Sequence, residues 1–128
     1  MAVIVPDTSV WIDLFGGESI PLLQEAIKES RVLLSPIVFA ELVSGVKNER
    51  ERVALIDSMS SLHVFEADIA HWTRVGDLRN HLRKKGLNIT IPDSHIAQCA
   101  IDRDAQLLTR DSIFKKIAPH TTLKLCEV

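Results

Sequence analysis

Short apolar runs alternate along the chain with segments in which hydrophobic residues recur every three or four positions. The apolar runs are rich in valine, isoleucine and leucine and predict strands at residues 2–5, 32–34, 62–65, 106–109 and 122–126. The periodic segments predict helices at residues 10–15, 21–27, 36–45, 49–59, 67–85, 92–102 and 112–117. Because strands that alternate with helices form parallel sheets covered on both faces, we expect an α/β fold in three layers, with about five short parallel strands flanked by helices.

Capping residues locate several of the predicted helix boundaries. Ser35 and Pro36 are of the types favoured at the N-cap and first position of a helix, and Gly16-Gly17 ends the first predicted helix. The segment 67–85 is amphipathic and ends at Gly86, with basic residues gathered towards its end. One predicted helix therefore has a basic C-terminal end.

Four carboxylates lie where an apolar run gives way to a helix, or inside an apolar helix: Asp7, Glu41, Asp93 and Asp111. Because the carboxyl ends of parallel strands meet at one edge of a sheet, we expect these side chains to converge there. Glu41 has only apolar neighbours from residue 37 to residue 43, where an unpaired carboxylate would be costly, so we do not expect it to be an ordinary surface residue. Helix capping is the simpler alternative for Asp7, Asp93 and Asp111.

Several carboxylates close together repel one another unless a cation lies among them. Ligation by oxygen atoms alone favours Mg²⁺ or Mn²⁺, and Mg²⁺ commonly shares its ligands with a substrate phosphate. The acidic group therefore predicts a divalent metal site and a phosphate ester substrate. The hydroxyl groups of Thr8, Ser9 and Thr109 are candidates to orient the carboxylates, with turn and cap formation as the alternative.

The remaining polar residues are expected to have ordinary roles. We predict that Asp13 is a solvated helix position and that Asp104 lies in a turn. Cys99 and Cys126 have neither the spacing of metal ligands nor the density of a disulfide scaffold, and are expected to be buried thiols. The histidines show no mutual spacing of a metal site and are expected at the surface or in contact with a partner, at positions 63, 71, 81, 95 and 120.

Composition adds few constraints. The chain has 128 residues, of which 46% are hydrophobic, so we expect one domain over residues 1–128. Setting the four acidic charges aside, the net charge of −2 becomes +2, which is only weakly basic. We find neither a basic, apolar signal segment nor an apolar run of about 20 residues, and therefore expect a cytoplasmic protein without a membrane span.

The four acidic residues lie in motifs that resemble those of the PIN-domain ribonucleases, most closely the VapC toxins of type II (VapBC) toxin–antitoxin systems. The motifs occupy residues 5–14 (VPDTSVWIDL), 35–42 (SPIVFAEL), 92–100 (PDSHIAQCA) and 107–114 (LLTRDSIF). The resemblance extends over essentially the whole chain. It implies a PIN-like fold and a homodimer.

The resemblance also implies an activity. Asp7, Glu41, Asp93 and Asp111 would hold one or two Mg²⁺ or Mn²⁺ ions, supported by Ser9 and Thr109, for hydrolysis of RNA phosphodiester bonds by metal-activated water that leaves a 5′-phosphate. Members often carry a further acid before the aromatic residue of the last motif, where this chain has Ile113. This departure makes Asp111 a candidate for ligation through water.

RNA must also be held; transfer and ribosomal RNA are candidate substrates, and the sequence does not identify the target. Phosphate contacts are expected from basic residues on the predicted helix 67–85 and beside Asp111: Arg74, Arg79, Arg83, Lys84, Lys85 and Arg110. The resemblance implies an inhibitory VapB-like antitoxin, whose C-terminal segment crosses the acidic groove and sets an arginine against the carboxylates.

Other functions fit the pattern less well. A processing or housekeeping PIN nuclease without an antitoxin is the nearest alternative, followed by a PIN-like scaffold module without catalysis. A receiver domain of a signalling protein would need paired acids at the end of the first strand, where this chain has Thr8-Ser9 after Asp7. A dehalogenase-type phosphatase would need a second aspartate in place of Ser9.

Overall fold

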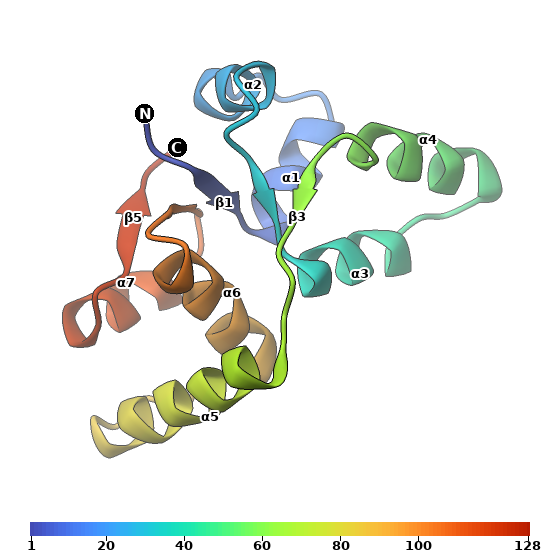
Figure 1. The fold of residues 1–128 in the computed structure, drawn as a ribbon. Coiled ribbons are helices and arrows are strands. Elements are labelled where there is room, and N and C mark those ends of the chain that lie inside the picture. Colours follow the sequence, from blue (N-terminus) through green and yellow to red (C-terminus); the bar gives the residue numbers. More distant parts are fainter.

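Five short strands lie at the centre of the computed structural model, which describes residues 1–128 (Figure 1). They are β1 (Ile4–Pro6), β2 (Leu33–Leu34), β3 (His63–Val64), β4 (Gln106–Leu108) and β5 (Lys124–Cys126). All pairings are parallel, with β4 between β1 and β5 in one sheet and β2 beside β3 in another. A single parallel bridge between Ile4 and Val32 links the two sheets. The predicted parallel α/β fold is confirmed, although its strands are hydrogen-bonded as three plus two.

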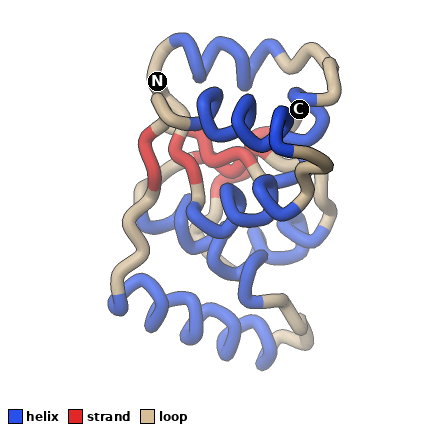
Figure 2. The backbone as a smooth tube through the Cα atoms, turned by 90° about the vertical axis from the view of Figure 1, so that its right-hand side faces the viewer, coloured by secondary structure: helices blue, strands red, loops and turns tan.

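Seven helices surround the strands, on both sides as Figure 2 shows. They are α1 (Thr8–Phe15), α2 (Pro21–Lys28), α3 (Pro36–Ser44), α4 (Glu49–Met59), α5 (Ile69–Lys84), α6 (Ile91–Asp102) and α7 (Ile113–Ile117), the last continued by a 3₁₀ turn over Ala118–His120. Side-chain caps set the boundaries: Asp68 accepts from the backbone of His71, so α5 begins two residues later than predicted. None of the helices combines the length and apolar character needed to cross a bilayer.

The hydrophobic core lies between the strands and the helices, and α6 is its most buried element. Seven consecutive residues of α6, from Ser94 to Ala100, are buried, whereas the other helices are buried along one side only. The central strand β4 is buried at Leu107 and Leu108, and β3 is exposed at the margin of the two-stranded sheet. The half-buried start of α6 therefore leads directly into the longest buried run of the fold.

Candidate active site

Asp7 follows β1 directly and is almost fully buried, with 4% of its surface exposed. It is the N-cap of α1: its Oδ1 accepts hydrogen bonds from the backbone of Val10 (3.1 Å) and the hydroxyl of Ser9 (2.8 Å). Its Oδ2 accepts a hydrogen bond from Thr109, the residue that follows β4. Asp7 therefore caps α1 and also lies at the candidate site, and three hydrogen-bond donors fix the direction of its carboxylate.

Glu41 reaches the same region from α3. Its Oε1 accepts a hydrogen bond from the Thr8 hydroxyl at 2.9 Å, which joins α3 to the first turn of α1. The apolar residues around Glu41 in the sequence do not bury it: Glu41 is exposed, with its carboxylate bonded to Thr8. The apolar stripe of α3 that faces the core passes through Val38 and Leu42, and the helical period turns position 41 away from it.

Asp93 lies in the first turn of α6 and is half-buried. Thr90 is the N-cap of this helix, and its hydroxyl accepts from the backbone N–H of Asp93 at 3.2 Å, so the Asp93 carboxylate is not needed as a cap. Burial raises the pKa of Asp93, the contact with Thr90 lowers it, and the negative charges of the other three acids raise it further. The four acidic residues therefore share one electrostatic environment.

Asp111 follows β4 by three residues and is exposed. Its Oδ1 accepts from the backbone of Ile113 at 3.0 Å, and its own N–H donates to the Thr109 hydroxyl at the same distance. Thr109 therefore contacts both Asp7 and Asp111, and orients two of the four acids. We name these four residues, Asp7, Glu41, Asp93 and Asp111, the acidic edge.

The acidic edge suits a hard divalent cation. Its donors are carboxylate oxygens, and hydroxyl groups hold two of the carboxylates in place. The carboxylate oxygens do not form a trio within 4.8 Å of one another; the trio in the structure that does is His71, His95 and Cys99. Mg²⁺ usually keeps several water ligands, so one or two carboxylates can bind it directly and the others through water.

Two histidines were misjudged from the sequence. His71 and His95, expected at the surface or in contact with a partner, are completely buried and lie 2.7 Å apart between His71 Nε2 and His95 Nδ1. A signal existed for His71, which shares the helical spacing of the buried residues Val75, Leu78 and Leu82 on α5. Burial, together with the neighbouring His71, lowers the pKa of His95 to about 4.

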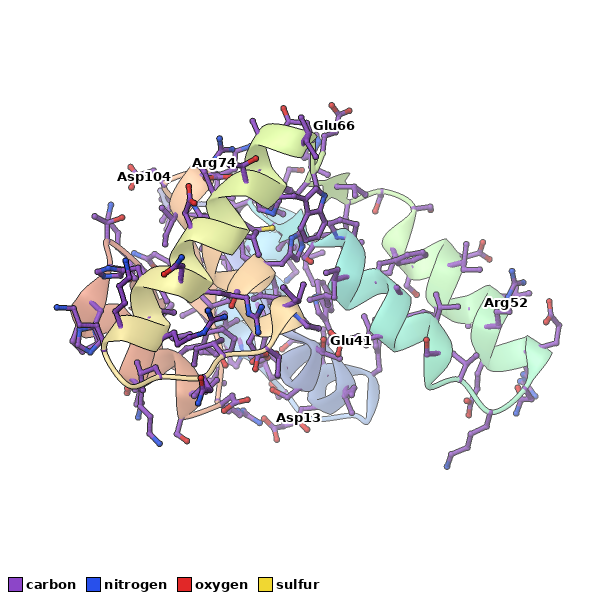
Figure 3. The ribbon with its side chains drawn as sticks, turned by 90° about the horizontal axis from the view of Figure 1, so that it is seen from below. Asp13, Glu41, Arg52, Glu66, Arg74 and Asp104 are labelled. Atoms are coloured by element: carbon purple, nitrogen blue, oxygen red, sulfur yellow. The ribbon has the colours of Figure 1, made fainter.

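Three of the six basic residues expected to bind RNA have partners within the protein. Arg74 binds both oxygens of Asp102 at 2.9 Å, Arg79 donates to the carbonyl of Ile89 at 2.8 Å, and Arg110 pairs with two acids at the surface. Those two acids are Asp13, which is paired rather than freely solvated, and Glu18. In Figure 3, Arg74 lies well away from Glu41 and Asp13.

The other three basic residues, Arg83, Lys84 and Lys85, are exposed at the C-terminal end of α5 and make no ion pair. The contact from Arg79 to the carbonyl of Ile89 joins the second half of α5 to the segment that leads into α6. The basic end of α5 therefore lies towards the N-terminal end of α6, which carries Asp93. Arg74 lies at the C-terminal end of α6, beside Asp102.

Of the expectations for Asp104 and the two cysteines, those for Asp104 and Cys99 are confirmed and that for Cys126 is only partly met. Asp104 lies in a turn, with a φ of 49°, and its carboxylate binds Lys124 at 2.6 Å. Both cysteines are free thiols; Cys99 is buried as predicted, whereas Cys126 is only partly buried. Burial raises the pKa of both thiols.

Comparison with protein families identifies the class to which this fold and site belong. The pattern of the PIN domain matches residues 4–119. The chain therefore belongs to the PIN-domain family, whose members are nucleases that generally use divalent metal ions. The family resemblance inferred from the four motifs is confirmed. Curated protein sequences give no match.

Solved structures with the same fold cover the whole chain. VapBC2 from Rickettsia felis, bound to a DNA fragment from its promoter, is 26% identical with a TM-score of 0.80, and the alignment covers 98% of each chain. VapBC-5 from Mycobacterium tuberculosis, a member of the VapBC family of toxin–antitoxin systems, is 26% identical with a TM-score of 0.73 and complete coverage of both chains, 100% each. DNA-bound VapBC from Salmonella typhimurium superposes with a TM-score of 0.85 over 99% of this chain and 98% of that one; at 22% identity it shows the fold alone.

Proposed function

We propose that this protein is a Mg²⁺- or Mn²⁺-dependent endoribonuclease and the toxin of a toxin–antitoxin pair. The observation that carries the proposal is the acidic edge, where burial raises the pKa of Asp93 and the negative charges of the other three carboxylates raise it further. Membership of a nuclease family and the likeness to VapBC structures support it. The substrate class we propose is structured RNA, with transfer and ribosomal RNA as the candidates to test first.

Each acid has a part in this proposal. Asp7 and Asp93 would hold the ion directly, Glu41 would bind from α3, and Asp111 would bind directly or through water. A bound divalent ion supplies a more acidic water and offsets charge on the scissile phosphate. Ser9 and Thr109 fix the Asp7 carboxylate, and Thr8 limits the movement of Glu41, so the oxygens are positioned before the ion arrives. Arg83, Lys84 and Lys85 would contact the RNA backbone.

The antitoxin would occupy an apolar groove of about 570 Å³ between α1, α3 and α4. Its apolar lining includes Ile12, Phe15, Leu42 and Leu55, and Glu41 borders it at the acidic edge. An amphipathic segment seated there would bring a following basic residue to the carboxylates, which would inhibit the enzyme by occupying the place of the cation. A homodimer, measurable by light scattering, is part of the same proposal.

The test is cleavage of isolated transfer RNAs and total RNA by purified protein with Mg²⁺, Mn²⁺ or EDTA. The proposal expects fragments that need the metal and are lost in Asp93→Asn. Asp77→Asn is the matched control, because it removes the same charge from an exposed position on α5. Metal-independent cleavage, or full activity of Asp93→Asn, would contradict the proposal.

Expression in cells separates a toxin from a housekeeping nuclease. A toxin arrests growth when expressed without its antitoxin, and Asp93→Asn should abolish that arrest while Asp77→Asn should not. RNA cleavage in vitro without growth arrest would favour a processing nuclease.

A further inference from the structure

A continuous chain of hydrogen-bonded side chains crosses the core beside the acidic edge. The carboxylate of Asp102 contacts His71 Nδ1 at 2.8 Å, and His71 Nε2 contacts His95 Nδ1 at 2.7 Å. His95 Nε2 in turn contacts the hydroxyl of Ser35 at 2.8 Å. His71, His95 and Ser35 are 0% exposed, so these groups have no access to water. We name these four residues, Asp102, His71, His95 and Ser35, the buried chain.

With both imidazoles neutral, one direction of hydrogen bonding satisfies every group in the buried chain. The Ser35 oxygen already accepts the backbone N–H of Val38 at 3.3 Å, so its own proton is free to point at His95 Nε2. His95 then carries its proton on Nδ1 and donates it to His71 Nε2. His71 likewise carries its proton on Nδ1 and donates it to Asp102.

The reverse arrangement fails at both ends. If His95 donated from Nε2, the Ser35 proton would have no acceptor, and an unprotonated His71 Nδ1 would face the Asp102 carboxylate. The outer end is held firmly, because Asp102 also accepts from Arg74 and from Gln98 Nε2, the latter at 2.8 Å. The buried chain is therefore directional, with the donors of both imidazoles pointing from the Ser35 hydroxyl towards the Asp102 carboxylate.

The buried chain joins elements that carry the acidic edge. Ser35 is the N-cap of α3, which carries Glu41, and His95 lies on α6 two residues after Asp93. The contact between Ser35 and His95 therefore links the N-cap of α3 to the second turn of α6. Hydrogen bonds of defined direction add to apolar packing by fixing both the distance between the two helices and their rotation. Repulsion among the carboxylates makes a fixed separation necessary.

We propose that His71 and His95 are positioning residues, which hold α3 and α6 at the separation that lets Glu41 and Asp93 act on one divalent ion. The role rests on the proposed metal-dependent nuclease. The buried chain spans three helices, because His71 lies on α5 and is braced by Asp102. A change at either end is therefore transmitted to the acidic edge without any contact with the ion.

The same histidines have a competing explanation as metal ligands. Cys99 Sγ lies 3.3 Å from His95 Nε2 and 3.8 Å from His95 Nδ1, and completes a trio with His71 and His95. However, two nitrogens that bind one tetrahedral zinc ion at about 2.0–2.1 Å stand roughly 3.3 Å apart. The observed 2.7 Å between His71 and His95 is the length of a hydrogen bond. The distances therefore favour hydrogen bonding over a transition-metal site.

The first test is spectroscopic and needs no activity. Protein labelled with ¹⁵N in histidine should show the Nδ1–H tautomer for both His71 and His95, because the Ser35 proton occupies one end of the buried chain. The Nε2–H tautomer at either residue would overturn the proposal. A thiolate charge-transfer band on adding Co²⁺, lost in Cys99→Ala, would also overturn it, because the trio would then be a metal site.

The second test measures Mn²⁺ affinity by calorimetry. Ser35→Ala breaks the buried chain and should weaken Mn²⁺ binding about tenfold, and Ser35→Thr, which keeps the hydroxyl and the cap, should restore it. The matched control is Asn48→Ala, which removes an equivalent cap from α4, a helix without a member of the acidic edge. Equal Mn²⁺ affinity in Ser35→Ala and wild type would contradict a positioning role.

Ser35→Ala also removes the cap of α3, which could by itself disturb Glu41. A second substitution that breaks the buried chain elsewhere excludes this explanation. His71→Leu leaves Ser35 and its bond to Val38 intact, and should weaken Mn²⁺ binding in the same direction. In the double variant the two effects should not add, because both substitutions break one chain. Fully additive effects would contradict the proposed positioning role. If the wild-type protein bound no Mn²⁺, the proposed function itself would fail. If the wild-type protein bound Mn²⁺ and neither substitution weakened binding, only the positioning role would fail.

Discussion

The two aspartates of α6 show how differently one residue type is treated within a single helix. Asp93 and Asp102 are nine residues apart in sequence, or about 13 Å along the helix axis. Burial and neighbouring negative charges raise the pKa of Asp93. Burial also raises the pKa of Asp102, but hydrogen bonds from Arg74, His71 and Gln98 outweigh it and lower that pKa to about 2.

This contrast is the one expected between a residue that binds a ligand, the role proposed for Asp93, and a residue that stabilises the fold, such as Asp102. Asp102 has three side-chain donors within the protein, whereas Asp93 has other carboxylates as its charged neighbours. An uncompensated cluster of like charge costs stability and is retained where a ligand compensates it. The following predictions use this difference between the acidic edge and the buried chain.

The largest effect is expected at Asp7. Asp7→Asn should reduce RNA cleavage by roughly a hundredfold or more, because it removes a ligand charge from the acidic edge while preserving the size of the side chain. Cleavage rates and circular dichroism should be measured together, with Asp57→Asn on the exposed face of α4 as control. A folded Asp7→Asn protein with wild-type cleavage would remove Asp7 from the active site. An unfolded protein would indicate that capping is its main role.

The two ends of α5 should respond differently to removal of positive charge. Replacing Arg83, Lys84 and Lys85 by glutamine should weaken RNA binding and lower the slope of its salt dependence by about one for each phosphate that is no longer neutralised. Arg74→Gln should leave that slope unchanged, because Arg74 is bound to Asp102. Fluorescence anisotropy with an Asp7→Asn background, at several salt concentrations, measures both. A lower salt slope in Arg74→Gln would contradict the proposal that only the C-terminal end of α5 contacts RNA.

Asp102→Asn should lower the free energy of unfolding by roughly 1–3 kcal/mol, because it weakens charge-assisted hydrogen bonds to three side chains. The pKa of Asp102 is lowered from 3.8 to about 2, so the stability it contributes is present above about pH 4 and lost as pH falls through 2. Urea denaturation at pH 5, 4, 3 and 2 should therefore show that the difference in free energy of unfolding between Asp102→Asn and wild type becomes smaller at the lowest pH values. Asp104→Asn, at an exposed pair with Lys124, should change little.

Much of the fold followed from local patterns in the sequence. Strand runs and helical periods predicted the order of elements, because burial of an apolar face follows from spacing alone. The capping of α3 by Ser35 was also local information. The division of the strands into two sheets depends on which backbone groups meet across long distances in sequence, and no local pattern contains that.

The candidate site was predicted less evenly. The convergence of the acidic edge followed from the rule that parallel strands end at one edge, whereas the exposure of Glu41 depends on how α3 is rotated about its axis. The buried chain was missed because its hydrogen-bonded pairs lie 24 to 60 residues apart in sequence and are brought together by the packing of three helices. Histidine spacing reveals a cluster within one helix, but not one shared between helices.

The smallest expected effect has a sign opposite to that at Asp102. In EDTA, Asp93→Asn should raise the free energy of unfolding by up to about 1 kcal/mol, because it removes a partly buried charge from three like-charged neighbours. Adding Mn²⁺ should make the wild type more stable than Asp93→Asn, because an ion that binds only the folded wild type stabilises it by mass action. Thermal denaturation with and without Mn²⁺ measures both signs. Destabilisation by Asp93→Asn in EDTA would show that the carboxylate supports the fold, and the contrast with Asp102 would then disappear.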